Sequence, residues 1–561
     1  MPIGAGRRRT AALSVMAVLA VVGLAAACSS SGGTDAGPVG TGPIGTTPVV
    51  TVPGGDVKMG GRLVFGTEAE SDGLDPTRGR WALAGMLVGY SIYDPMYAYD
   101  ADGVARPYAL ESGVPSADFK TWTHKLRPGM KFHDGTPVNA AALKKQFDAF
   151  KASTLTGPAL RLYDSSEVID DLTVVSHLNA PWASLPNVLT GQGGALVSPA
   201  TLDDPDGGRH PIGSGPFKFK EWTTDDHLTV VRNDQYWMKD KAGRQLPYLD
   251  EVVFKPIPEA QARVSSFEAG DFDIIHDDHP IQQARLAERA ANGESQYVPD
   301  LGHKEKNFIL LNASRPPLDD PLLRRALAYA TEPAQYLEVT GTPLDAQADT
   351  AFEPDSKWHA DVPFPRFDLA KANELMAQYR AKHGDGPVSF RLSSGATSTG
   401  AQIVQLFQHQ WERIGVTVQP EALEQITLIA QAVSGTYDAI VWRQFGAPDP
   451  DGDWHFWTGH NSSGTFALNF SRLQDDELDR NLDIGRASDD FATRKAAYDI
   501  VQQRWADLVP YIWLDFDQWV VAASNRVHGI GSNDFPDGTK AQPFYTGANR
   551  LTATWVDPPP S

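Results

Sequence analysis

The residues with the clearest chemical potential form one loop, 442–454, which reads Trp-Arg-Gln-Phe-Gly-Ala-Pro-Asp-Pro-Asp-Gly-Asp-Trp. Its aromatic faces, its guanidinium and its three carboxylates suit a solute held by ring contacts and charged hydrogen bonds. The candidate ligand contacts in this loop are Trp442, Arg443, Phe445, Asp449, Asp451 and Trp454. An Asp-Pro pair also favours turns, so the alternative that these aspartates only shape the loop stays open.

The three aspartates do not match a calcium loop, and no catalytic motif accompanies them. An EF-hand loop has glycine at about position six and glutamate at about position twelve. With Asp449 as the first position, the glycine, Gly452, comes at the fourth and the twelfth is His460. The patterns His-Glu-x-x-His, Gly-x-Ser-x-Gly and Gly-x-x-x-x-Gly-Lys are absent from the sequence. We therefore expect no catalytic residue, no metal and no cofactor. Paired carboxylates keep an exported glycosidase as a weaker alternative.

Cys28, the only cysteine, follows an uncharged apolar stretch and the basic run Arg7-Arg8-Arg9. This order, with small residues before the cysteine, is typical of an export signal and resembles a bacterial lipoprotein signal. We expect residues 1–27 to be removed and Cys28 to carry a lipid that anchors the chain to the outer face of the cytoplasmic membrane. An ordinary secretory signal remains the alternative, and the general and twin-arginine export routes both stay open.

Composition limits the classes of protein to which the rest of the chain can belong. The 561 residues carry a formal charge of −21 and are 41% hydrophobic, which predicts large cores under an acidic surface that disfavours nucleic acid. One cysteine allows no internal disulfide, so stability must come from core size. Residues 28–57 are rich in Gly, Ser, Thr and Pro and predict a flexible tether.

The elements that must position the loop alternate between strand and helix. Strands are expected at 388–392, 416–418 and 438–442, with helices between them, one of them capped by Thr399 and Gln402. This order favours a mostly parallel sheet whose ligands lie at the carboxyl ends of its strands. The candidate set therefore gains Ser393 and Ser394 after one strand, and Glu68 after the first strand of the chain, expected at 62–66.

Five further segments occur in a recognisable order. They are 126–137 (Leu-Arg-Pro-Gly-Met-Lys-Phe-His-Asp-Gly-Thr-Pro), 213–219 (Gly-Ser-Gly-Pro-Phe-Lys-Phe), 232–237 (Arg-Asn-Asp-Gln-Tyr-Trp), 269–273 (Ala-Gly-Asp-Phe-Asp) and 316–330. Each segment alone is turn chemistry with aromatic residues. Together and in this order they resemble the substrate-binding proteins of the dipeptide/oligopeptide/nickel ABC-transporter family (family 5).

The resemblance implies an α/β, two-lobed periplasmic-binding-protein fold of the class II or cluster C type, with mixed sheets and a two-segment hinge. We expect lobe I at 58–312 with an extra subdomain at about 91–211, lobe II at 313–517, and a return to lobe I at 518–561. The hinge crossings are expected near Asn312 and Asp517. The implied function is that of a monomeric binding component that passes a solute, foremost an oligopeptide, to an ABC permease and ATPase complex.

Two departures from the family pattern concern the ligand. Peptide-binding relatives place an aspartate shortly after the tryptophan of the ligand loop, where this chain has Gln444 and Phe445. Dipeptide binders carry Arg and Tyr in the earlier loop, where this chain has Ser393-Ser394-Gly395-Ala396. A dipeptide specialist is therefore not expected. A longer peptide, another solute (a sugar, a glycolipid precursor or a metal chelate), and a role as sensor or envelope assembly factor stay open.

Overall fold

The computed structural model describes residues 49–51, 54–302, 304–545 and 547–558. The expected signal at 1–27, Cys28 and most of the expected tether lie outside the described residues. Val50, near the end of that tether, forms an antiparallel bridge with Tyr297 and packs against a hydrophobic cluster, so this part of the segment lies against the folded body. Within the described ranges, no helix combines the length and the apolar character that crossing a membrane requires.

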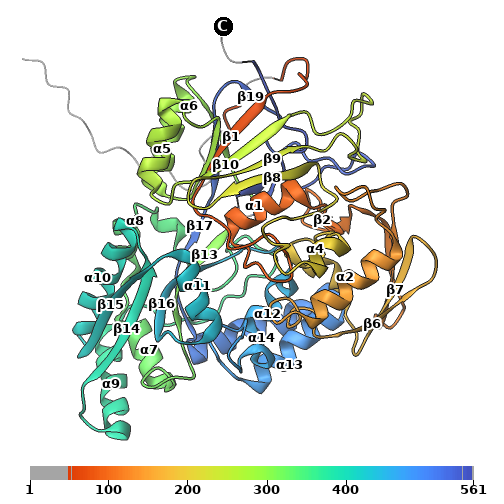
Figure 1. The fold of residues 1–561 in the computed structure, drawn as a ribbon. Helices are drawn as coiled ribbons and strands as arrows, with labels where there is room; N and C mark the ends of the chain where they lie inside the picture. Colours follow the sequence, from red (N-terminus) through yellow and green to blue (C-terminus); the bar gives the residue numbers. More distant parts are fainter. Residues whose placement is uncertain (1–48, 52–53, 303, 546, 559–561) are drawn as a thin grey trace, which may run out of the picture. The chain divides into compact units, whose positions relative to one another are not determined.

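The first lobe is built on a seven-stranded mixed sheet (Figure 1). In order across the sheet its strands are β12 (Gln296–Pro299), β18 (Val520–Ala523), β11 (Ile274–Asp277), β1 (Arg62–Thr67), β10 (Glu251–Pro256), β9 (His227–Arg232) and β8 (Phe217–Thr223). Because successive side chains of a strand alternate, Leu63 and Phe65 pack with α1 (Leu83–Ile92). Val64 packs on the opposite face, with α5 (Ala260–Ala269) and α6 (Pro280–Ala291).

An inserted subdomain follows α1 and has its own hydrophobic core. Its strands are β2 (Tyr97–Tyr99), β3 (Ala105–Pro107) and a four-stranded antiparallel sheet of β4 (Leu110–Pro115), β5 (Thr121–Leu126), β7 (Thr173–Leu178) and β6 (Tyr163–Val168). Its helices are α2 (Ala140–Ala152), α3 (Leu185–Val188) and α4 (Pro199–Asp203). Asn139 caps α2, because its side chain accepts a hydrogen bond from the Ala142 amide at 2.9 Å.

The second lobe is built on a five-stranded sheet, in the order β15 (Val416–Leu423), β14 (Val388–Gly395), β16 (Ala439–Gln444), β13 (Glu305–Leu311) and β17 (Tyr511–Asp517). β14 runs parallel to both of its neighbours, whereas β13 runs antiparallel to β16 and β17. The three strands expected to alternate with helices, β14, β15 and β16, therefore pair in parallel, whereas β13 and β17, which bring the chain into and out of the lobe, make the sheet as a whole mixed.

Helices cover both faces of the second sheet. They are α7 (Pro321–Ala330), α8 (Pro333–Thr340), α9 (Leu369–His383), α10 (Ser398–Glu412), α11 (Gln425–Ser434), α12 (Trp454–Trp457), α13 (Asp476–Ala487) and α14 (Phe491–Leu508). The expected cap at Thr399 was wrong: the cap of α10 lies two residues earlier, at Thr397, whose hydroxyl accepts from the Gly400 amide at 3.1 Å. Ser393 and Ser394, expected in a loop, lie in β14, which pairs with β15 as far as Gly395.

The chain changes sheets twice. It leaves the first sheet after Pro299 and enters the second at Glu305, and it returns between Asp517 and Val520. The first crossing thus precedes Asn312, because β13 already pairs with β16 and β17 before that residue. After the return, two small hairpin-like sheets complete the first lobe, β19 (Val527–His528) with β22 (Trp555–Val556) and β20 (Phe544–Tyr545) with β21 (Ala548–Asn549).

Candidate functional site

The loop that follows β16 lies where the two lobes meet. Phe445 belongs to the second lobe by sequence, but its ring packs against the hydrophobic cluster of the first lobe. The buried ammonium of Lys306 donates to the Phe445 carbonyl at 2.5 Å and to the Asp453 carboxylate at 2.7 Å. Both partners of this ion pair are almost fully buried. The beginning and the end of the loop are therefore fastened to the strand that enters the second lobe.

Asp449 has its charge matched within the loop's own lobe. The Arg494 guanidinium of α14 donates to both carboxylate oxygens of Asp449, at 2.6 and 2.7 Å. The same carboxylate accepts from the Asp451 amide at 3.0 Å and so caps the short 3-10 helix η3 (Pro450–Asp453). This geometry is the turn-shaping role that Asp-Pro favours.

Asp451 joins the inserted subdomain to the second lobe. Its carboxylate is fully buried and accepts from Trp182 Nε1 at 2.6 Å, Ser184 Oγ at 2.6 Å and Arg486 Nε at 2.9 Å. Burial alone would raise the pKa of Asp451, but the Arg486 charge and these hydrogen bonds outweigh it and lower the pKa below its ordinary value. The Arg486 guanidinium also lies 3.7 Å from the ring centre of Trp454, which is itself buried.

Arg443 and Glu68 lie in one charged cluster at the lobe junction. The Arg443 guanidinium forms ion pairs with Asp278 of the first lobe and, at 3.4 Å, with Glu305. Although burial opposes its charge, these carboxylates raise the pKa of Arg443 above its ordinary value. Burial would likewise raise the pKa of Glu68, but His276, which pairs with it, and Arg443 lower that pKa to about 2. Glu68 and Arg443 are therefore both charged at neutral pH.

Three further candidates contact groups within the second lobe. Trp442 packs edge-on against Phe470, with ring centres 5.2 Å apart, and its buried Nε1 has no hydrogen-bond partner. Ser393 is fully buried and donates to Glu421 at 2.6 Å. Ser394 is also buried and makes one long hydrogen bond, at 3.3 Å, to the carbonyl of Gly395. The structure thus brings Glu68, Arg443 and Phe445 to the lobe junction and places these three elsewhere.

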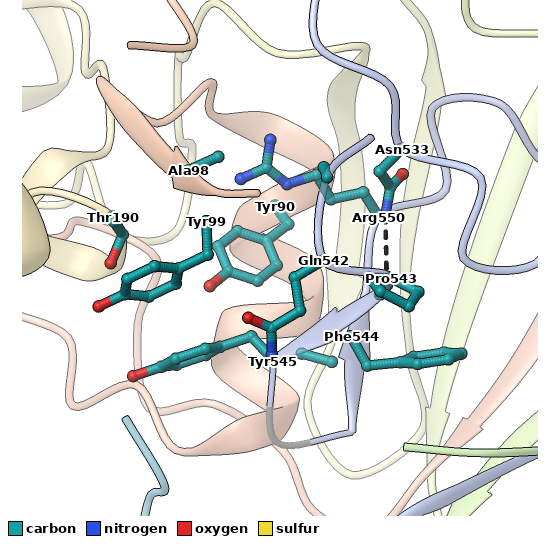
Figure 2. A pocket seen from close by; sticks show the side chains of 12 residues that line it. Tyr90, Ala98, Tyr99, Thr190, Asn533, Gln542, Pro543, Phe544, Tyr545 and Arg550 are labelled. Carbon is teal, nitrogen blue, oxygen red and sulfur yellow. Dashed lines mark hydrogen bonds between the residues drawn. The ribbon is translucent and has the colours of Figure 1, made fainter. Parts of the chain in front are cut away.

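Sequence reasoning missed a recess on the first-lobe side of the junction. Its walls come from α1, β2 and the β20–β21 hairpin, and include the rings of Tyr90, Tyr99 and Tyr545 (Figure 2). Tyr99 and Tyr545 stack at 6.0 Å between ring centres. A Cβ atom on Gly452 of the candidate loop would lie 3.9 Å from the Tyr99 hydroxyl, so the recess adjoins that loop. No sequence signal joins elements more than four hundred residues apart.

Metal ligation finds no support in the described part of the chain, where no group of three or more His, Cys, Asp or Glu side chains is arranged to hold an ion. The charged groups of the junction are instead paired with one another, as Arg443 with Asp278 and Lys306 with Asp453. Such an arrangement, with aromatic walls, suits noncovalent recognition of a polar solute.

Comparisons with known proteins agree with this geometry. A family model described as "Bacterial extracellular solute-binding proteins, family 5 Middle" matches residues 105–465. The chain is similar to the glutathione-binding protein GsiB of Pectobacterium atrosepticum, with 29% identity over 477 residues that cover 82% of this chain and 89% of that protein. The glutathione-binding protein GsiB of Escherichia coli (strain K12) is 27% identical over 475 residues, with the same shares covered.

Solved structures resemble the whole folded body. The oligopeptide-binding protein AppA from Bacillus subtilis, in complex with a nonapeptide, matches with a TM-score of 0.76 at 22% identity, covering 90% of this chain and 100% of that one. AgaA from A. tumefaciens R10, in complex with agropinic acid, matches with a TM-score of 0.76 at 25% identity, covering 89% and 99%. These similarities confirm the expected two-lobed α/β fold.

Proposed function

We propose, since this chain belongs to the bacterial extracellular solute-binding proteins of family 5, that it captures a small peptide between its two lobes and delivers it to an ABC permease. The match over 105–465 confirms the family expected from the sequence. The observation that carries the choice of site is the junction itself, where Phe445 of one lobe packs against the other and the same loop adjoins, at Gly452, a recess with tyrosine walls. Glutathione and short oligopeptides are the first ligands to test, because similar proteins bear the names of glutathione and peptide binders.

We assign different roles to the candidate residues according to their partners. Glu68, Arg443 and Phe445 line the lobe junction and are proposed to contact the solute. Asp449 and Asp451 are each satisfied by an arginine of the second lobe, so we propose that they hold the loop in shape. The same structural role is proposed for Trp442, Trp454, Ser393 and Ser394, which are packed or hydrogen-bonded within the chain.

Capture by closure follows from the two crossings between the sheets. Two parallel connections act as a hinge about which one lobe rotates against the other. The contacts that span the lobes, such as Arg443 with Asp278 and Asp451 with Trp182, would then form on closure and break on opening. We propose that a solute enters the open form and that these contacts re-form around it.

The test is binding without turnover. Isothermal titration of the full mature chain with glutathione, with alanine peptides of two to nine residues and with a sugar control should show one site for at least one peptide. Thermal melting should then rise with ligand concentration, because a ligand that binds only the folded state stabilises it. Mass spectrometry of the recovered ligand should find it unchanged. Binding of the sugar alone, or conversion of the peptide, would contradict the proposal.

Anchoring at Cys28 is a separate proposal with its own test. If the cysteine carries a lipid, Cys28→Ala should move the protein from the membrane fraction to the soluble extracytoplasmic fraction while its peptide affinity stays unchanged. Ser29→Ala is the matched control and should remain with the membrane. Retention of the Cys28→Ala protein in the membrane fraction would contradict the lipid anchor and leave the binding proposal untouched.

A further inference from the structure

The recess beside the candidate loop contains one guanidinium. Arg550 follows the β20–β21 hairpin and extends over the ring of Tyr90, whereas the amide of Gln542 lies closer to Tyr545 in the same recess (Figure 2). Its guanidinium carbon lies 5.2 Å from the ring centre of Tyr90 and 4.5 Å from that of Tyr108. The cavity measures about 30 Å³, which is room for about two water molecules or one small polar group.

Arg550 has no carboxylate partner within ion-pair distance among the described residues, unlike the other arginines of the junction. Its charge is close enough to Asp94 to favour the ionised form of that carboxyl. However, Asp94 is buried and its carboxylate accepts from Tyr236, Trp237 and Ser214 instead. A half-buried guanidinium held over aromatic rings keeps its donors available for an anion.

Two acidic residues of the candidate loop that lie near the recess are neutralised by other cations. Asp449 is bound by Arg494 through two hydrogen bonds, and Asp453 is paired with Lys306 at 2.7 Å. Both aspartates lie within electrostatic range of Tyr99. Burial raises the pKa of Tyr99, and the charges of the two aspartates raise it further. Because these two charges are compensated, the charge that lines the recess itself is that of Arg550, with the carboxylate of Asp94 buried behind it.

We infer that this recess is the subsite for a carboxylate of the solute, with Arg550 as its cation and Gln542 as a neutral donor in the same recess. This inference rests on the proposed function and makes it more specific, since it requires a ligand with a free carboxylate at the end that enters the first lobe. The tyrosine rings exclude water around the ion pair, which strengthens it relative to a pair in bulk solvent.

The experiment compares peptides that carry free carboxylates with the same peptides after their carboxylates have become neutral methyl esters. The full mature chain is incubated with a tryptic casein digest containing reduced glutathione, or with the same mixture after methyl esterification, and retained molecules are identified by mass spectrometry after gel filtration. Wild-type protein should retain peptides from the first mixture at least about tenfold better than their esters, because a hydrogen bond to a charged group contributes about 10- to 140-fold in affinity. Arg550→Gln should lose a similar factor for the untreated mixture.

A second variant keeps the test valid if Arg550→Gln unfolds. Gln542→Glu preserves the shape of a side chain in the recess and adds a negative charge to the lining that contains Arg550. Retention of untreated peptides should therefore fall at least about tenfold, while retention of their esters does not. Arg413→Gln is the matched control, because Arg413 also lies over an aromatic ring, that of Phe367 at 5.3 Å, but in the second lobe. It should retain both mixtures as the wild type does.

The outcomes separate the two proposals. If the wild type retains nothing from either mixture, peptide capture itself is wrong and the subsite falls with it. If the wild type retains untreated and esterified peptides equally, the carboxylate subsite is wrong and peptide capture stands. The same conclusion follows if Gln542→Glu and a folded Arg550→Gln both retain the untreated mixture as the wild type does.

Discussion

Asp451 offers the sharpest test of how the loop is held. Its carboxylate accepts from Trp182, Ser184 and Arg486 and is fully buried, as is the Arg486 side chain. Asp451→Ala would leave the buried guanidinium of Arg486 without its carboxylate. Removing one partner of a buried ion pair costs about 3–5 kcal/mol. Each kcal/mol lowers the melting temperature by about 2–4 °C in a domain of about 150–250 residues, which is the size of the second lobe. We therefore expect a fall of about 6–20 °C.

The assay is thermal unfolding followed by circular dichroism at pH 7 without ligand. Glu374→Ala is the control, because Glu374 pairs with Lys371 on an exposed helix face, where ion pairs contribute about 0–1 kcal/mol. The double variant Asp451→Asn/Arg486→Met should be less destabilised than the sum of its single changes, since directly paired residues couple by about 0.5–3 kcal/mol.

Two results would refute this reasoning. A melting temperature for Asp451→Ala within about 2 °C of that of the wild type would mean that the three donors do not depend on this carboxylate. Strict additivity in the double variant would mean that Arg486 and Asp451 do not act as a pair. A loss of peptide affinity at unchanged stability would instead return Asp451 to the ligand contacts expected from the sequence.

Three further predictions concern stability at other sites. Glu68 has a pKa of about 2 in the folded protein against a usual 4.5, so its carboxylate stabilises the fold above about pH 4.5, and this contribution of about 3 kcal/mol is lost as the pH falls toward 2. Glu68→Gln should flatten urea stability against pH in that window, and an unchanged slope would contradict the paired carboxylate. Asn139→Ala should cost about 1 kcal/mol in urea unfolding, because it removes the α2 cap, whereas the exposed Asn373→Ala should cost less. Gly485→Ala should cost about 1–3 kcal/mol despite a better helix propensity, because a Cβ atom there would lie 2.6 Å from the Tyr498 ring; a more stable variant would contradict the packing of α13 on α14.

The sequence predicted best those elements whose signals are local. The strands expected at 62–66, 388–392 and 416–418 follow from residue type and alternation, and all three occur, within β1, β14 and β15. The orientation of β13 and β17 could not be predicted from alternation of strands and helices, because it depends on where the chain enters and leaves the second lobe. The five short segments identified the family because each is a turn with aromatic residues that the fold requires at a given place, so their order along the chain follows the order of the elements.

The site was harder to predict because residue type does not reveal the partner. Asp451 and Arg443 both lie in the candidate loop or beside it, yet one is bound by the subdomain and the other by Asp278 of the first lobe. Arg550 carried no sequence signal, since its significance depends on Tyr90 and on the lack of a nearby carboxylate partner in the described structure. Only folding brings these residues together.

Native mass spectrometry tests the central claim, capture of one solute between the lobes, most directly. The mature protein is purified without unfolding from cells grown on a peptide digest, and its intact mass is compared with that of the same sample after unfolding. We predict one additional small peptide per chain, with a free carboxylate, released chemically unchanged on unfolding. An intact mass equal to that of the chain alone, both from these cells and after added glutathione and peptides, would contradict the account.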